Sequence, residues 1–279
     1  MNESTGTGSL GELQFDEALR RLPPGWQAAL ADCAIEPAAG LGGASVFRVS
    51  HHRDGCRYLK LAWGPEAQPL RSEIARTEWL SSHHIRVPKF LMKACTDDVT
   101  ACLMTAVPGW HPTPRPPCPA AFDLPAAMRA IGRGLARLHK VPVADCPFDE
   151  MPRTRLARAL DDIDHNRVDA SQFDVRNASI PPHRLYRRLA GTVPACEDIV
   201  VVHGDPTLEN MLIGPDGELG FIDCGHAGYS DPYLDLAVVD MDLRASFGRD
   251  AAEGFIAAYG IRDWDDRKAA FFRDLYELF

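Results

Sequence analysis

The sequence predicts an α+β protein with a small β-rich N-terminal lobe and a larger, mainly helical C-terminal lobe. Two short strand-like runs, VFRV and RYLKLA, lie within residues 41–63, whereas helical patterns dominate after residue 125. Between them, HPTPRPPCPAAFDLP (111–125) holds six prolines. Because proline removes a backbone donor and fixes φ, this segment is expected to be a linker or surface loop.

The composition is that of an ordinary globular chain. With 279 residues, 46% of them apolar, it can bury a large core in one bilobal unit or two domains. The net charge of -9 argues against a nucleic-acid partner and suits a cationic ligand. No apolar run approaches the ~20 residues that span a bilayer, and no secretory signal is visible. The eight cysteines form no C-x-x-C pair, which predicts reduced thiols in a cytoplasmic protein.

The N-terminal lobe is expected over residues 26–107, after a polar, Pro-interrupted extension (1–25). VFRV and RYLKLA flank a polar turn that contains glycine, which predicts a hairpin. A third strand-like run, ACLMTAV (101–107), stops at Pro108. The segment LRSEIARTEWLSSH predicts a helix with one buried face: Leu70, Ile74, Thr77 and Leu80.

The C-terminal lobe, residues 108–279, is expected to combine helices with one short hairpin. Helical sequence also occurs between residues 150 and 190, broken by VDASQFDVRNASIPP. The segment AAMRAIGRGLARLHK predicts a helix with an apolar stripe: Met128, Ile131, Leu135 and Leu138. The final segment, FFRDLYELF, predicts an amphipathic helix that packs three side chains against the lobe: Phe272, Leu275 and Phe279.

Polar side chains gather where a buried run ends, in VVHGDPTLENMLI (201–213). Asn210 opens a strand that leads into the turn sequence GPDG, and Asp223 follows the returning strand. A β-hairpin brings Asn210 and Asp223 to the same end, close to the loop that carries Asp205. Carboxylate and amide oxygens are ligands that suit magnesium, so Asn210 and Asp223 are the predicted metal ligands. Asp205 is then left for another role. Alternatively, His203 and His226 could join the two aspartates in a hydrolase-like metal site.

HGDPTLEN followed by IDCG resembles the catalytic and metal-binding segments of the aminoglycoside phosphotransferases, relatives of the protein kinases. The resemblance to the 3'-phosphotransferase (kanamycin and neomycin kinase) branch extends over roughly residues 26 to 279, in the same order: GLGGASVFRV, YLKLA, SEIARTEWL, CPFD, IDCGHAGYSDPYLDLA and FFRDLYELF. It implies a protein-kinase-like bilobal fold. It also implies transfer of the γ-phosphate of ATP, with GTP as an alternative donor, to an aminoglycoside hydroxyl in the presence of Mg²⁺.

The resemblance assigns the phosphoryl-transfer residues position by position. Asp205 is implied to orient the substrate hydroxyl and accept its proton, while Asn210 and Asp223 hold magnesium. Lys60 is implied to pair with nucleotide phosphates and with a helix carboxylate, expected to be Glu73 rather than Glu78. Backbone contacts to the phosphates and adenine are expected at Gly42, Gly43, Ser45, Met104, Ala106 and Val107. Two further residues are implied to be structural, Asp235 as a brace of the catalytic loop and His203 as a hydrogen-bonding residue.

The acceptor side departs from the family. The resemblance implies substrate-site residues at Asp174, His226, Asp242, Glu277 and Phe279, among which Glu277 and the terminal carboxylate of Phe279 are the candidates for binding ammonium groups. The family's acidic loop corresponds to VDASQFDVRN in this chain. Asp169 and Asp174 are the acidic residues of this segment, and its other residues are neutral or basic. His226 stands where relatives commonly carry arginine, and Ala245 stands where an acidic residue is often found. These departures are expected to lower the affinity or change which aminoglycoside is preferred.

The expected function is therefore an aminoglycoside kinase that confers resistance, with the 3'-hydroxyl favoured as acceptor. Two alternatives are a kinase of the same fold for streptomycin (3''-type), a sugar or a choline-like amine, and a catalytically idle nucleotide-binding module. The intact set of Lys60, Asp205, Asn210 and Asp223 argues against the idle module. The sequence predicts no membrane partner and leaves monomer and dimer open.

Overall fold

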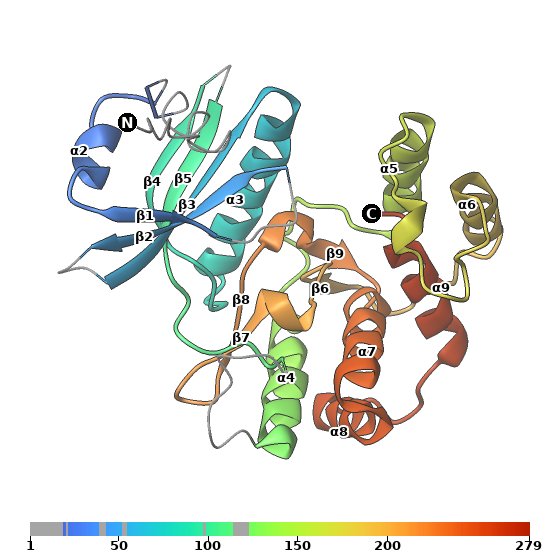
Figure 1. Ribbon diagram of the computed structural model, residues 1–279. Helices are drawn as coiled ribbons and strands as arrows, with labels where there is room; N and C mark the ends of the chain where they lie inside the picture. The colour runs from blue at the N-terminus through green and yellow to red at the C-terminus, as the bar shows by residue number, and fades with distance from the viewer. Residues whose placement is uncertain (1–18, 21, 39–42, 52–54, 97–98, 114–122) are drawn as a thin grey trace, which may run out of the picture. The chain divides into compact units, whose positions relative to one another are not determined.

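The structure, a computed structural model, describes residues 19–20, 22–38, 43–51, 55–96, 99–113 and 123–279. The described residues form two compact units. The first unit runs to Glu78 and includes Pro88–Ala106, and the second unit contains Trp79–Val87 and Val107–Phe279. A sheet dominates the first unit and helices dominate the second, so the α+β fold class is confirmed (Figure 1).

The first unit is built on an antiparallel sheet with the strand order β1-β2-β3-β5-β4. Its strands are β1 (Ala34–Pro37), β2 (Ser45–His51), β3 (Gly55–Trp63), β4 (Phe90–Cys95) and β5 (Val99–Thr105). The predicted hairpin is β2–β3, in which Val46 lies opposite Lys60. The predicted strand 101–107 is β5, which ends earlier than expected, at Thr105.

Alternation along β3 sends neighbouring side chains to opposite faces of this sheet. Leu59 and Leu61 are fully buried in a cluster with Trp26 of helix α2 (Trp26–Leu30). Ala62 joins Leu70 and Ile74 of helix α3 (Ala67–Ser82) in a second cluster. Lys60 shares the parity of Ala62, so its side chain leaves the sheet on the α3 face. The periodicity of β3 therefore determines which helix Lys60 can reach.

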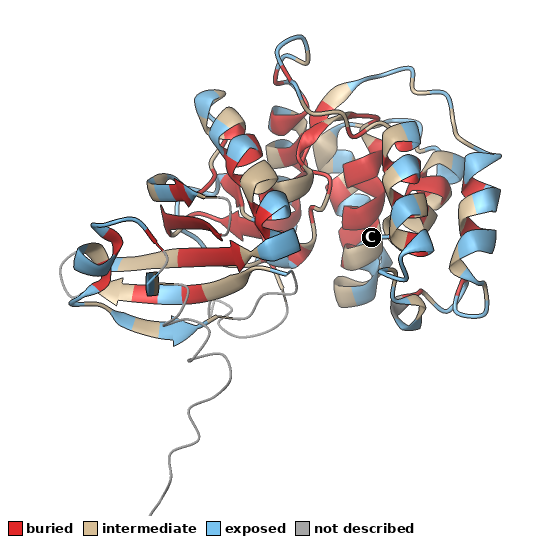
Figure 2. Ribbon diagram, turned by 90° about the horizontal axis from the view of Figure 1, so that it is seen from above, coloured by how far each residue is buried: buried red, intermediate tan, exposed pale blue. Residues whose placement is uncertain are grey.

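The second unit is mainly helical and carries two small antiparallel ladders. Its helices are α4 (Leu124–Leu138), α5 (Pro152–Asp164), α6 (Pro182–Ala190), α7 (Tyr233–Phe247), α8 (Arg249–Tyr259) and α9 (Asp266–Tyr276). One ladder is the predicted hairpin of β7 (Met211–Ile213) and β8 (Leu219–Phe221), and the other joins β6 (Val200–Val202) to β9 (Gly228–Ser230). The predicted stripe of α4 is buried, as is most of α7 (Figure 2). Among the described residues, no helix is long and apolar enough to cross a membrane.

The four residues predicted on the inner face of α3 are all buried, but the helix is divided between the two units. The last turn of α3 belongs to the second unit, because Leu80 packs with Ile85 and Val87 in that unit's core. The prediction that Phe279 packs into the lobe is wrong, since its side chain is 43% exposed. Helix α9 ends before it, and Leu278 is buried instead.

Two glycines in neighbouring helices provide a matched test of this packing. A Cβ at Gly132 of α4 would lie 2.7 Å from the backbone nitrogen of Tyr259 in α8, whereas a Cβ at Gly254 of α8 would lie 3.8 Å from Met128. We expect Gly132→Ala to lower the free energy of unfolding by about 1–3 kcal/mol through overpacking. Gly254→Ala should leave it unchanged or raise it by up to about 1 kcal/mol, because alanine favours helix. Urea unfolding of both variants measures the difference, and an equal loss would contradict the close approach of α4 and α8.

Candidate active site

One buried carboxylate holds the loop that follows β6. The Asp235 Oδ2 atom accepts the His203 backbone N–H at 2.7 Å, and Oδ1 accepts the Gly204 N–H at 2.7 Å. Asp235 is fully buried, and the His139 Nε2 atom lies 3.1 Å from Oδ2. Because a buried carboxylate is unfavourable without donors, these bonds fix the backbone at the start of the loop. Asp235 therefore has the contacts expected of a bracing residue.

The His203 side chain is part of the same scaffold. Its Nε2 atom lies 3.0 Å from the Ile222 carbonyl oxygen, which assigns the proton to Nε2. Its Nδ1 atom accepts the Asp205 backbone N–H at 3.3 Å, and its ring stacks on Phe221. In the described part of the chain, no group of three His, Cys, Asp or Glu side chains could hold a metal ion. The hydrolase-like metal site considered from the sequence is therefore not formed.

Gly204 is required by the shape of this loop. Its φ angle is +82°, in the left-handed region that residues with a Cβ seldom adopt. A Cβ at this position would overlap the carbonyl oxygen of His226. Any other residue would therefore shift either the loop or the turn that follows β8.

Both carboxylate oxygens of Asp205 accept hydrogen bonds from side chains of the protein. The Asn210 Nδ2 atom donates to Oδ2 at 2.8 Å and also to the Asp205 carbonyl oxygen at 2.9 Å. The Tyr276 hydroxyl, at the end of α9, donates to Oδ1 at 2.8 Å. Burial raises the pKa of Asp205 above its ordinary value, and the electrostatic effects of His203 and Arg155 and the Tyr276 hydrogen bond oppose that rise. The carboxylate is thus oriented by two donors and made more basic by its surroundings.

The β7–β8 hairpin brings Asn210 and Asp223 to one end, as predicted. Met211 pairs with Phe221, and the Ile222 N–H donates to the Asn210 carbonyl oxygen at 3.0 Å. Since the Asn210 Nδ2 atom is used by Asp205, the amide oxygen Oδ1 is the atom suited to a cation. Asp223 is exposed and adopts a left-handed backbone (φ 56, ψ 51), a conformation that is unfavourable for a residue other than glycine. An amide oxygen and an exposed carboxylate fit the oxygen ligands that Mg²⁺ prefers.

In the first unit, Lys60 forms the ion pair that the sequence predicts. Its Nζ atom lies 2.6 Å from the Glu73 Oε1 atom, and the Lys60 residue is only 7% exposed. Glu78, the weaker candidate, pairs with Lys93 instead. The pair is thus present, while its role toward a nucleotide stays a prediction.

The other predicted nucleotide contacts lie in the first unit or next to its edge. Ser45 begins β2 directly after Gly43, whereas Gly42 lies outside the described residues. Met104 is buried in β5, and the strand ladder ends one residue later. The backbone groups of Ala106 and Val107 therefore lie beyond the ladder, where they are not committed to strand pairing.

Two of the residues predicted to bind the acceptor substrate meet near the end of α9. The Glu277 carboxylate accepts the Asp174 backbone N–H at 3.2 Å and the Asn177 Nδ2–H at 2.9 Å. The Asp174 carboxylate accepts the backbone N–H and the Nε–H of Arg176, which lowers its pKa. Burial raises the pKa of Glu277. Arg176 therefore partly neutralises the charge of Asp174, the acidic residue whose backbone contacts Glu277.

The remaining acceptor candidates take different places. The rings of His226 and Phe279 make an edge-to-face contact with centroids 6.3 Å apart. The Phe279 ring also lies 4.2 Å from the guanidinium carbon of Arg155, a cation–π contact. Asp242 accepts the Leu208 N–H at 2.8 Å, so its carboxylate supports the catalytic loop.

Sequence reasoning missed Tyr276 and Arg155. Tyr276 precedes Glu277, and that adjacency to a predicted acceptor residue was its only sequence signal. Arg155 is fully buried, with Nη1 3.3 Å from Glu150 and 3.4 Å from the Gly204 carbonyl oxygen. Burial lowers the pKa of Arg155, and nothing in the helical pattern of α5 distinguishes it from a surface arginine.

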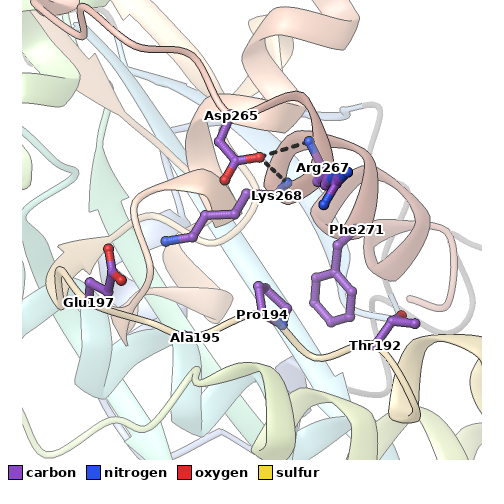
Figure 3. A pocket seen from close by; sticks show the side chains of 8 residues that line it. All are labelled: Thr192, Pro194, Ala195, Glu197, Asp265, Arg267, Lys268 and Phe271. Atoms are coloured by element: carbon purple, nitrogen blue, oxygen red, sulfur yellow. Dashed lines mark hydrogen bonds between the residues drawn. The ribbon is translucent and has the colours of Figure 1, made fainter.

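A hollow of about 390 Å³ lies elsewhere in the second unit, at the first turn of α9 (Figure 3). Its lining residues are Thr192, Pro194, Ala195, Glu197, Asp265, Arg267, Lys268 and Phe271. Asp265 caps α9 through two backbone N–H groups, and Lys268 pairs with the buried Asp231. Tyr276 is at the other end of the eleven-residue helix, about 16 Å along its axis. The hollow is therefore separate from Asp205, and two of its charged side chains already stabilise the fold.

Comparison with known proteins gives consistent matches over most of the chain. A model of the phosphotransferase enzyme family matches residues 34–272. An aminoglycoside 3'-phosphotransferase from Streptomyces fradiae is 32% identical over 83% of this chain and 94% of the relative. A streptomycin 3''-kinase from Streptomyces griseus is 35% identical over 80% of this chain and 84% of the relative. The structure of aminoglycoside phosphotransferase APH(3'')-Id from Streptomyces rimosus, in complex with ADP and streptomycin, matches with a TM-score of 0.80 at 30% identity, covering 96% of this chain and 98% of that one.

The brace at Asp235 can be tested by an isosteric change. Asp235→Asn replaces one acceptor oxygen with an NH₂ group that would face a backbone N–H. We expect the free energy of unfolding to fall by about 2–4 kcal/mol, because a buried donor loses its partner. Asp263→Asn, at an exposed position, should change it by less than about 0.5 kcal/mol. Denaturant unfolding of the two variants makes the comparison, and equal stability would remove Asp235 as the brace.

Proposed function

This chain belongs to the aminoglycoside phosphotransferase family, and from that premise we propose that it transfers the γ-phosphate of ATP to a hydroxyl of an aminoglycoside antibiotic. The added group brings charge and bulk to the part of the drug that binds ribosomal RNA, so resistance follows. We assign residues 26–107 to the nucleotide-binding lobe and residues 108–279 to the catalytic and substrate-binding lobe. We also propose a cytoplasmic location and no nucleic-acid or membrane partner.

The environment of Asp205 carries this proposal. A carboxylate that is to receive a proton from an alcohol must be ionised, oriented and partly removed from water. Asp205 meets these requirements through the Asn210 donor on Oδ2 and through its burial. The raised pKa of Asp205 makes it a better proton acceptor than an exposed aspartate.

Asp205 acts on the acceptor alcohol. The hydroxyl donates its hydrogen bond to the carboxylate, which directs the oxygen toward the γ-phosphorus. As the new oxygen–phosphorus bond forms, the bond to ADP breaks and the hydroxyl proton passes to Asp205. Because the transition state of such transfers is loose, orientation contributes more than basicity.

Asn210 and Asp223 would hold Mg²⁺ through the Asn210 amide oxygen and the Asp223 carboxylate. When bound, the ion offsets negative charge on the nucleotide phosphates. The left-handed backbone of Asp223 is consistent with this role, because strained conformations persist where a site requires them.

The first unit supplies the proposed nucleotide contacts. Lys60, held by Glu73, would bind phosphate oxygens through its ammonium group. Gly42, Gly43 and Ser45 would approach the phosphates through their backbone, and the 104–107 segment would face adenine. ATP is the proposed donor and GTP the alternative, since both share the phosphate groups that these residues would contact.

The 3'-hydroxyl is the favoured acceptor position, with streptomycin's 3''-hydroxyl as the second candidate. Several 3'-phosphotransferases match at 30–33% identity, which supports the first. The 35% identity to a streptomycin 3''-kinase supports the second. Glu277 and Asp174 are the proposed ammonium contacts, and the other residues proposed to face the drug are Asp242 of α7, His226 and Phe279.

Asp205→Asn tests the proposed proton acceptor. The amide keeps the size of the side chain but cannot accept the hydroxyl proton, so kcat should fall by about 10²–10⁴-fold. ATP binding, measured by calorimetry, should stay within about threefold of the wild-type Kd, because Asp205 contacts the acceptor rather than the phosphates. Asp216→Asn, an exposed change in the β7–β8 turn, serves as the control. Unchanged turnover by Asp205→Asn would exclude Asp205 from proton transfer.

A panel of acceptors tests the substrate class. Kanamycin, neomycin and streptomycin are each incubated with the protein, MgATP and a coupled assay for ADP release. We expect at least one aminoglycoside to raise ADP release, and fragment mass spectrometry to locate the phosphate on the 3'-hydroxyl of kanamycin. Phosphorylation of streptomycin alone would select the 3''-type function. Stimulation by a sugar or choline, and by none of the three drugs, would overturn the proposed substrate class.

A further inference from the structure

The second unit places one of its own hydroxyl groups on the proposed catalytic carboxylate. The Tyr276 oxygen lies 2.8 Å from the Asp205 Oδ1 atom, the distance of a charge-assisted O–H···O hydrogen bond. The other oxygen, Oδ2, is bound by Asn210. A phenol is an alcohol-like donor, so Tyr276 makes the same hydrogen bond that the acceptor hydroxyl must make before transfer.

Tyr276 is held as a donor by its surroundings. Burial, the Asp205 charge and their shared hydrogen bond all raise the pKa of the Tyr276 phenol, so it keeps its proton at neutral pH. The residue is nonetheless only partly buried, unlike its neighbours Leu275 and Leu278. The backbone is anchored by α9, so displacement of the phenol from Asp205 would require a rotation about the side-chain bonds of Tyr276.

Two residues of the proposed acceptor site lie near Tyr276: Glu277 follows it in the chain, and the charge of Asp242 acts on its phenol. Tyr276 ends α9, and Glu277 directly after it contacts the Asp174 backbone. A molecule that bound to these carboxylates would lie next to the Tyr276–Asp205 hydrogen bond. Because the two places adjoin, an acceptor that occupied its site would also displace the phenol from Asp205.

We propose that the Tyr276 hydroxyl occupies the acceptor's place on Asp205 when no acceptor is bound, keeps water out of that place, and yields it to the acceptor hydroxyl. This inference rests on the proposed function and adds a specificity-determining residue to it. A water molecule on Oδ1 could give its proton to Asp205 while its oxygen bonded to the γ-phosphorus and the bond to ADP broke, releasing ADP and inorganic phosphate. Tyr276 would suppress that hydrolysis, and an acceptor would have to compete with it.

Tyr276→Phe separates this role from simple positioning of Asp205. The ring remains and only the hydroxyl is lost, so water and acceptor can reach Oδ1 without competition. We expect ADP release without acceptor to rise by about tenfold, and the KM for the acceptor to fall by about tenfold to a hundredfold, the range of a lost hydrogen bond to a charged group. The kcat for transfer should stay within about threefold. The acceptor is whichever of kanamycin, neomycin and streptomycin the wild-type protein phosphorylates.

Tyr233→Phe is the matched control, because the Tyr233 hydroxyl accepts the Asp265 N–H in the same unit and contacts no residue of the proposed site. It should leave both ADP release and acceptor KM unchanged. Tyr276→Leu repeats the test with a second side chain that lacks the hydroxyl, and thermal unfolding verifies that the variants are folded.

Two results would overturn the inference. In one, Tyr276→Phe lowers kcat without raising acceptor-independent ADP release, which would make Tyr276 a residue that only positions Asp205. In the other, neither ADP release nor acceptor KM changes. Failure of the proposed function is a separate outcome, because the wild-type protein would then transfer phosphate to none of the three drugs.

Discussion

The pair of hydrogen bonds between the buried Asp235 carboxylate and the backbone of His203 and Gly204 is the constraint on which the site depends. It fixes the point at which the chain leaves β6, and the left-handed Gly204 then turns the chain toward Asp205. Asn210 and Tyr276 attach to Asp205 only because that side chain is presented in one direction. If these two bonds were broken, the buried Asp235 carboxylate and the backbone N–H groups of His203 and Gly204 would each need new hydrogen-bond partners.

The energetically unfavourable features of the site lie among the residues proposed for phosphoryl transfer. Asp205 is partly desolvated, and Asp223 adopts a left-handed backbone. The surrounding hydrogen bonds and the β7–β8 hairpin make these arrangements tolerable, in keeping with strain that is stored where it serves chemistry. The acceptor half is looser: Asp174 is compensated by Arg176, and Phe279 is largely exposed. Variation in this half would change substrate preference while leaving the chemistry of transfer intact.

Elements with clear periodicity were predictable from the sequence. The β2–β3 hairpin and the stripe of α4 follow from alternation and helical spacing. The Lys60–Glu73 pair, which the structure contains, was implied by the family resemblance. The β6–β9 ladder was missed, because no turn sequence joins its two distant strands, whereas GPDG marked the equally short β7–β8 hairpin. The Tyr276–Asp205 bond joins residues 71 positions apart, and only the packing of α9 against the lobe brings them together. Roles toward nucleotide, metal and drug came from the family resemblance, not from periodicity.

The most direct test of the account is a crystal structure with Mg²⁺, a non-hydrolysable ATP analogue and the preferred aminoglycoside. The account predicts that one drug hydroxyl lies within about 3 Å of the Asp205 Oδ1 atom, where the phenol of Tyr276 now donates. It also predicts that the Asp235 bonds to His203 and Gly204 are unchanged. A drug hydroxyl directed at the γ-phosphate but remote from Asp205, with the Tyr276 bond intact, would contradict the assignment of Asp205 as the group that receives the acceptor's proton.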